Sequence, residues 1–91
     1  MGNTAKFNLG RTVITAHAKE VLNSESIDNA LHLHSLGIWG DMCDEDKAVN
    51  NSALKEGGRL FSVYYDFSGK KFWIITEANR SFTTVLLPED Y

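Results

Sequence analysis

The stretch "RLFSVYYDFSGKKFWIITEANRSFTTVLL", residues 59–87, decides the fold of this chain. Three runs within it are rich in β-branched and aromatic residues, and their side chains follow the period of two that is typical of strands. The connections "DFSGKK" and "EANRS" are short enough for hairpins. The stretch therefore predicts three antiparallel strands in meander order.

The middle run, "KFWIITEA" at residues 71–78, predicts the central strand of this meander. Alternate side chains of a strand point to opposite faces of a sheet, so the run divides into two rows. The two rows are Phe72, Ile74 and Thr76 on one side and Trp73, Ile75 and Glu77 on the other. Because both rows begin with apolar residues, we expect one face to pack on helices and the other to be partly exposed.

Upstream of the meander, the pattern is mainly helical. The β-branched run at 11–15, "RTVIT", predicts a short strand, and "AHAKEVL" at 16–22 predicts a short helix. Apolar residues then recur at helical spacing and predict a second helix over 26–35, with Ser24 or Ser26 as its N-terminal cap. These elements predict an α+β fold in two layers.

This α+β fold combines two or three short helices with a three-stranded antiparallel β-meander, and the N-terminal strand is an optional addition. A chain of 91 residues that is 43% hydrophobic can build one core, so we expect a single domain over 1–91. The only cysteine, Cys43, excludes an internal disulfide. No apolar run approaches the roughly 20 residues of a membrane span. We therefore expect a cytoplasmic protein without membrane contact.

The net charge is concentrated in one part of the chain. Residues 1–35 and 59–91 are each neutral overall, so the whole formal charge of −3 lies in residues 36–58. The charged residues there are Asp41, Asp44, Glu45, Asp46 and Glu56, with Lys47 and Lys55. A charge of one sign on one segment indicates a surface that attracts a basic partner.

This acidic segment also predicts a third helix. Asp41 is the expected N-cap, and Gly57-Gly58 the expected end. The first turn holds three consecutive acids, where the helix dipole favours carboxylates. The apolar positions form only a narrow stripe, namely Ala48, Val49, Ala53 and Leu54. Most of this helix should therefore face water or a partner.

Patterns that would indicate a metal, a cofactor or nucleic acid are weak. His32 and His34 point in divergent directions on a helix, and three consecutive acids project about 100° apart, so neither set converges on one ion. The glycines lack the spacing of a phosphate loop, and the chain has no basic stripe for a nucleic-acid backbone. We expect no metal, no cofactor and no direct nucleic-acid contact.

Two further features each have two interpretations. Trp39, between Gly37 and Gly40, either fills the core beneath a loop or stands exposed as an anchor for a partner. Glu77 and Arg80 lie across a tight turn, where they form either an ion pair that stabilises the turn or part of a ligand site.

Four segments resemble a family of short chains from plasmids, phages and integrative elements that is described as "plasmid-related protein". The segments are "KFNLGRTVIT", "HSLGIWGD", "EDKAVNNSALKEGGRL" and "WIITEANRSFTTVLLPEDY". Candidate site residues that match the family pattern are His34, Trp39, Asp41, Glu45, Asp46, Asn50, Thr76, Glu77, Arg80 and Ser81. The resemblance implies a bacterial mobile element as the setting, and it implies no particular activity.

The chain departs from that family pattern at two places. Ala16-His17 stands where the family tends to have Pro-Gly, so His17 is not a candidate site residue. Ile38 replaces an acid before the tryptophan, which removes any acidic role at that position.

The leading hypothesis is a non-enzymatic interaction module that binds a basic partner protein from the host or the element. Its expected contact residues are Trp39, Asp41, Asp44, Glu45, Asp46 and Asn50. The mobile-element setting suggests an inhibitor of host defence, of the anti-restriction or anti-CRISPR type.

Two alternatives remain open. One is a small enzyme or ligand site, with His34 as acid or base and Arg80 holding an anion. Its residues would be His34, Asp41, Thr76, Glu77, Arg80 and Ser81. The other is a homo-oligomer in which the outer strand of the meander pairs with its copy, or in which the exposed face packs on another copy.

Overall fold

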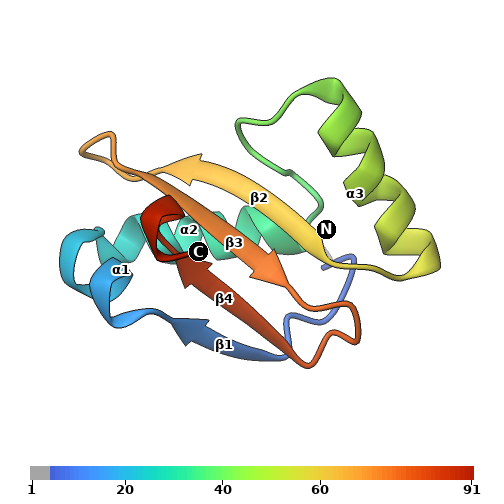
Figure 1. The fold of residues 1–91 in the computed structure, drawn as a ribbon, viewed down its shortest axis with the longest axis horizontal. Helices are drawn as coiled ribbons and strands as arrows, with labels where there is room; N and C mark the ends of the chain where they lie inside the picture. Colours follow the sequence, from blue (N-terminus) through green and yellow to red (C-terminus); the bar gives the residue numbers. More distant parts are fainter. Residues whose placement is uncertain (1–4) are drawn as a thin grey trace.

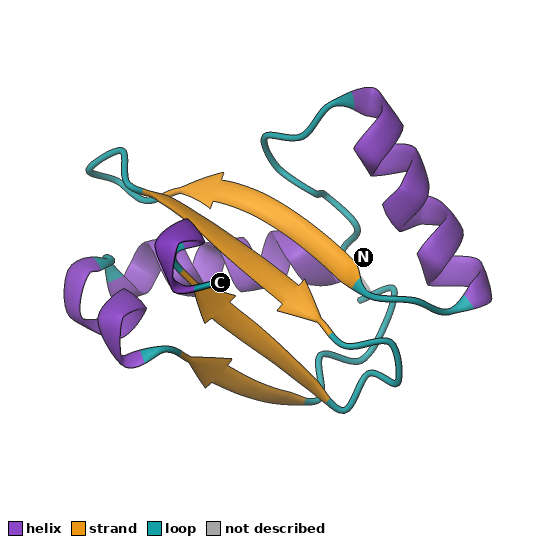
Figure 2. Cartoon of the chain, in the orientation of Figure 1, coloured by secondary structure: helices purple, strands orange, loops and turns teal. Residues whose placement is uncertain are grey.

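The computed structural model describes residues 5–91, in which a four-stranded sheet is combined with three α-helices (Figures 1 and 2). The strands are β1 (Arg11–Ile14), β2 (Leu60–Tyr65), β3 (Lys71–Thr76) and β4 (Phe82–Leu86). The helical segments are α1 (Ala16–Val21), α2 (Ser24–Ser35), α3 (Asp44–Glu56) and the 3₁₀ turn η1 (Pro88–Asp90). The predicted α+β class is confirmed. The predicted domain also includes residues 1–4, which lie outside the described residues.

The sheet is mixed, with the strand order β1-β4-β3-β2. β2, β3 and β4 form the predicted antiparallel meander. β1 joins it as a fourth strand, parallel to β4, so the expectation of a three-stranded antiparallel sheet is corrected in this detail. The helical crossover that follows β1 permits the parallel pairing. Hydrogen bonds to β4 fix both ends of β1, from Arg11 N–H to Ser81 O at 3.1 Å and from Thr15 N–H to Val85 O at 3.0 Å.

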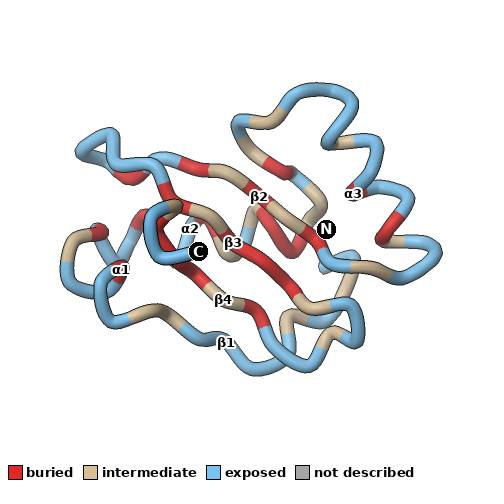
Figure 3. The backbone as a smooth tube through the Cα atoms, viewed as in Figure 1, coloured by how far each residue is buried: buried red, intermediate tan, exposed pale blue. Residues whose placement is uncertain are grey.

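The main core lies between one face of the sheet and the helices α1 and α2, and α2 crosses behind the sheet in Figure 1. The predicted inner row of β3 is confirmed, since Phe72, Ile74 and Thr76 are fully buried (Figure 3). The helices contribute apolar side chains that include Leu22 and Ile27. Burying each large apolar side chain stabilises the fold by about 1.5–3 kcal/mol.

The opposite face of the sheet is only partly covered. The chain end lies against it, with ring centroids 5.7 Å apart for Tyr91 and Trp73 and 4.9 Å apart for Phe61 and Trp73. At the β1 side of this face, Val13 and Phe82 are exposed. This pattern agrees with the expectation of one packed and one partly exposed face.

α2 begins two residues earlier than expected. Asn23, and neither Ser24 nor Ser26, is the N-cap, because its side-chain oxygen accepts a hydrogen bond from Ser26 N–H at 2.9 Å. Asparagine is among the best N-cap residues, and its place before the serines moves the helix start to Ser24. The helix ends as predicted, since Gly37 adopts φ 78°, the left-handed conformation that terminates helices.

α3 lies beside β2, away from α1 and α2 (Figure 1). Its N-cap is Cys43 and not Asp41, which corrects the prediction. Asp41 is held by β2 instead: its N–H donates to Val63 O at 2.8 Å, and its carboxylate accepts a hydrogen bond from the Tyr65 hydroxyl at 2.9 Å. The three acids of the first turn and the end of the helix at Gly57 are as predicted.

The free edge of β2 is closed at two positions. The Asn50 side chain donates to Phe61 O at 2.6 Å and accepts from Phe61 N–H at 3.1 Å. Two residues further on, Val63 N–H donates to Trp39 O, and a bridge forms between Val63 and Gly40. Gly40 has φ 80°, and a Cβ there would collide with Val63 O, so glycine is required. This edge is therefore blocked against pairing with another chain.

Candidate functional site

Trp39 belongs to a second, smaller core between α3, β2 and the N-terminal segment. Only 3% of the residue is exposed, and it packs with Ala53 and Leu60. Its ring lies 5.5 Å from the His34 ring, and its Nε1–H donates to Asn51 Oδ1 at 3.0 Å. The core interpretation of Trp39 is therefore correct. The prediction that Trp39 is an exposed anchor for a partner is wrong, because its ring is covered by other residues.

Asn50, another expected contact residue, is also buried. Both ends of its amide bind the main chain of Phe61, so its polar groups are already used within the protein. A buried amide that closes a strand edge has a structural role. The expectation of a direct contact between Asn50 and a partner is corrected accordingly.

The remaining expected contact residues are exposed acids in the loop before α3 and in its first turn. They are Asp41, Asp44, Glu45 and Asp46. Because consecutive helix residues project about 100° apart, the three helical acids point in three directions. Asp46 lines a groove against β2, while Glu45 precedes the exposed Val49 by four residues and shares its face. Asp44 points to the flank away from that groove.

This groove separates α3 from the partly exposed face of the sheet, and its volume is about 290 Å³. The lining residues are Met42, Asp46, Val49, Asn50, Arg59 and Phe61. Val49 was expected on the buried stripe of the helix, yet it is 65% exposed. The groove therefore combines apolar surface with two charged groups, the Asp46 carboxylate and the Arg59 guanidinium. A single valine among polar residues was the only sign of it in the sequence.

The alternative polar site centres on His34, which is fully buried under the sheet. Its Nδ1 forms a hydrogen bond with Ser62 Oγ, and its Nε2 forms one with Thr76 Oγ1 at 2.9 Å. The Thr76 and Thr83 hydroxyl groups share a hydrogen bond of 2.7 Å. The Thr83 hydroxyl in turn donates to Leu9 O, also at 2.7 Å. Burial, together with the positive charge of Arg80, lowers the pKa of His34 to about 3. His34 is thus a neutral, hydrogen-bonded core residue.

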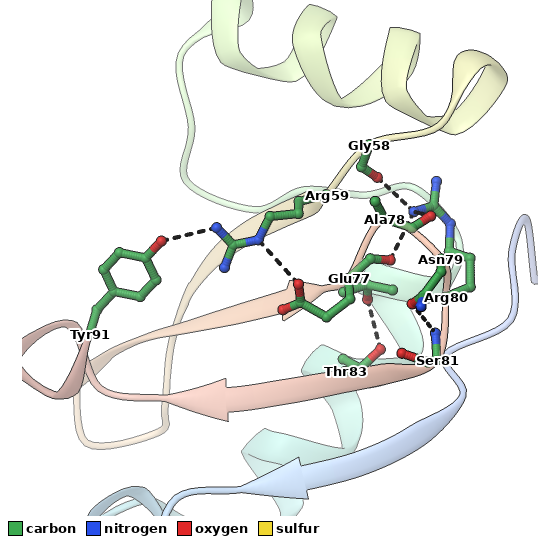
Figure 4. Close-up of polar contacts among 10 residues, drawn as sticks. Gly58, Arg59, Glu77, Ala78, Asn79, Arg80, Ser81, Thr83 and Tyr91 are labelled. Carbon is green, nitrogen blue, oxygen red and sulfur yellow. Dashed lines mark hydrogen bonds and ion pairs between the residues drawn. The ribbon is translucent and has the colours of Figure 1, made fainter.

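Arg80 binds main-chain carbonyl groups and not the Glu77 carboxylate (Figure 4). Its guanidinium donates to Gly58 O at 2.6 Å and to Ala53 O at 3.0 Å, and also to the carbonyls of Glu77 and Ala78 at 3.1 Å each. The Glu77 carboxylate lies 3.6 Å from Arg59 Nε instead. The expected Glu77–Arg80 ion pair is therefore wrong. Arg80 ties the end of α3 to the β3–β4 turn.

The residues of the alternative site do not converge on one cavity. His34 is enclosed by hydroxyl groups, Arg80 by carbonyls, and Asp41 is bound to Tyr65 beside β2. Ser81 is exposed in the β3–β4 turn, where its N–H donates to Asn79 Oδ1. A reaction would require these groups within hydrogen-bond reach of one substrate atom. The arrangement that the enzyme hypothesis needs is not assembled in residues 5–91.

Arg80→Lys is expected to destabilise the protein by about 1–3 kcal/mol, because one ammonium group cannot reach the carbonyls of two segments that the guanidinium joins. Urea unfolding followed by circular dichroism measures the change. Arg59→Lys is the matched control, since Arg59 makes only exposed contacts and its replacement should cost about 0–1 kcal/mol. Equal losses for both variants would contradict the structural role of Arg80.

Three further findings concern the class of protein. No helix within residues 5–91 is both long enough and apolar enough to cross a bilayer. Among the same residues, no three side chains of His, Cys, Asp or Glu gather closely enough to hold a metal ion. No protein-family model, curated protein or solved structure matches this chain.

Proposed function

We propose that this protein is a small interaction module that binds a basic partner protein through α3 and the groove beside it. α3 projects beside the sheet, and only Asn50 and Ala53 of its 13 residues are buried (Figures 1 and 3). A helix that contributes so little to its own core leaves a broad surface for another molecule. The exposed acids of its first turn, which outnumber Lys47 and Lys55 on the same helix, give this surface a net negative charge.

The groove between α3 and β2 is the observation that carries the proposal. Val49, Met42 and Phe61 line it with apolar surface, and Asp46 stands at its side. An apolar groove with an adjacent carboxylate suits a partner that presents an apolar side chain next to a lysine or arginine. The acids steer the encounter and make the affinity sensitive to salt. Glu45, on the same face as Val49, adds to this field.

The resemblance of four segments to the plasmid-related chains supports a proposal for the biological setting. We extend the proposal to a bacterial mobile element, in which the basic partner belongs to a host-defence system and the module acts as an anti-restriction or anti-CRISPR type of inhibitor. Cys43 is exposed and free, which suits the reducing cytoplasm as the place of this interaction.

An affinity capture from host lysate tests the proposal, with the wild type and Asp46→Lys, Val49→Ser and Asp44→Lys compared at low and high salt. We expect a specific protein with a basic surface to bind the wild type and to be released by salt. Asp46→Lys and Val49→Ser should lose it, because both alter the groove. Asp44→Lys is the matched control: it also removes an acid of the first turn, but on the flank away from the groove.

Either of two results would contradict the proposal. One is that no specific protein is retained by the wild type. The other is that the Asp46 and Val49 variants bind as the wild type does, while their circular dichroism spectra show that they are folded. A loss with Asp44→Lys alone would move the contact to the opposite flank of α3.

A further inference from the structure

β1 is an edge strand whose outer main-chain groups have no partner among residues 5–91. In the parallel ladder with β4, the hydrogen bonds of Arg11 and Thr15 show that odd-numbered residues face β4. The N–H and C=O groups of Thr12 and Ile14 therefore point away from the sheet. Figures 1 and 2 show β1 at the margin of the molecule, with no element beyond it.

The two edges of the sheet are thus treated differently. The β2 edge is closed by Asn50 and by the loop at Gly40, whereas residues 5–91 place neither a covering loop nor a side-chain amide on the β1 edge. Natural sheets usually protect their free edges, because an open edge is a template for another strand. Because the β2 edge is protected and the β1 edge is not, we infer that the β1 edge is available to pair with another strand.

We propose that a second copy of this chain pairs with β1, so that two four-stranded sheets join into one through antiparallel β1 strands. A two-fold axis at Val13 places Thr12 of each copy opposite Ile14 of the other. These are the residues whose main-chain groups point outward. Each Thr12–Ile14 pair exchanges two hydrogen bonds, so the edge groups of both copies are satisfied.

The side chains at this edge support self-pairing. Val13 is 39% exposed, and its neighbour Phe82 on the same face of β4 is 40% exposed. At the two-fold axis, Val13 meets its own copy as a non-hydrogen-bonded pair, in which side chains approach most closely. Two valines and two nearby phenylalanines then lose water-exposed apolar surface together.

Charge complementarity supports the same register. Arg11 of one copy comes to lie opposite Thr15 of the other, and the Thr15 hydroxyl contacts the Asp90 carboxylate at 3.4 Å. Asp90 also binds His17 at 3.1 Å, and the acid Glu89 precedes it in the chain. Each Arg11 guanidinium thus meets an acidic site on the partner copy. Within one copy, Arg11 and Thr15 are separated by roughly 13 Å of strand, since each residue rises about 3.3 Å.

The expected dimer is weak and reversible, because a four-residue edge buries less than the roughly 1,200 Å² of a stable interface. It is independent of the proposed partner contact, since α3 lies beside β2 at the other edge of the sheet. Asp46→Lys should therefore dimerise as the wild type does. A failure of one proposal leaves the other standing.

Analytical ultracentrifugation from micromolar to near-millimolar concentration tests the dimer. We expect the mass of the wild type to rise toward two copies, and Val13→Lys to raise the dissociation constant by about tenfold or more, because two ammonium groups then face each other. Arg11→Glu and Asp90→Lys should each weaken the dimer. The double variant Arg11→Glu/Asp90→Lys should restore the dimer mass, because the exchanged charges again face each other across the two-fold axis.

Amide hydrogen exchange adds a readout at single residues. Raising the concentration should slow exchange at Thr12 and Ile14, while Val13, already bonded within the sheet, should change little. A mass of one copy at every concentration would overturn the proposal. So would a dimer that Val13→Lys leaves intact, or a double variant that dimerises no better than the single ones.

Discussion

Trp39→Ala should destabilise the protein by about 3–5 kcal/mol, the usual cost of removing a buried indole ring. The ring is almost fully buried and fills the space between Ala53, Leu60 and the Phe7 and His34 rings. Its removal leaves a cavity and also breaks the hydrogen bond from the indole N–H to Asn51 Oδ1. A loss of this size approaches the whole stability of many small domains, so much of the variant should be unfolded near physiological temperature.

Urea unfolding measured by circular dichroism tests this expectation. Trp39→Phe should recover most of the stability, because a second aromatic ring keeps the packing with Phe7. Ile38→Ala, a change at the exposed neighbour, is the control and should stay within about 0.5 kcal/mol of the wild type. A Trp39→Ala variant of unchanged stability that no longer binds the partner would restore the surface-anchor interpretation.

The second large effect is a loss of stability in acid that comes from His34. Its pKa is lowered from 6.5 to about 3 in the folded protein, so the unfolded chain takes up the proton first. Stability is therefore full above pH 6.5 and falls as the pH drops toward 3. The slope approaches about 1.4 kcal/mol per pH unit within this window.

A comparison of His34→Gln with the wild type isolates this effect. The variant should be less stable at neutral pH, but it should lose little stability between pH 6.5 and 4. Asp66 affects stability only at lower pH. Burial alone would raise its pKa, yet hydrogen bonds from Lys70, Ser68 and Asn23 lower this pKa to about 2. Its contribution to stability is therefore lost below pH 4. Identical slopes for both proteins between pH 6.5 and 4 would contradict the buried neutral state of His34.

His17 acts in the opposite sense and at higher pH than His34. The hydrogen bond to Asp90 raises the pKa of its exposed imidazole above 6.5, so its contribution is full below pH 6.5 and is lost as the pH rises through the raised pKa. Solvent screening keeps that contribution small. Because it is constant below pH 6.5, it leaves the slope that His34 produces unchanged.

The meander could be predicted because its determinants are local. Alternation along residues 71–76 assigns each side chain to a face, and the short turns leave few other connections. The place of β1 could not be predicted in the same way, since its pairing with β4 joins residues about seventy positions apart. The start of α2 was missed by two residues because Asn23 and the two serines are all good caps, and only the chain geometry chooses among them.

The only part of the candidate site that could be predicted from the sequence was the exposure of its charged residues. The acids of α3 had to be exposed, since carboxylates are rarely buried without partners. The groove was not predictable, because Met42, Val49 and Phe61 come from a loop, a helix and a strand. The role of Arg80 was hidden for another reason. Its partners are main-chain carbonyls, and a sequence does not show where these point.

The buried chain of hydroxyl groups fixes the proton on His34 to one nitrogen. Leu9 O can only accept, so Thr83 donates to it and must accept from Thr76. Thr76 then has no proton left for the imidazole, and Nε2 must be the protonated nitrogen that donates to it. Nδ1 consequently accepts from Ser62. One main-chain oxygen near the N-terminus thus selects the tautomer of a histidine on α2 and orients every proton between them.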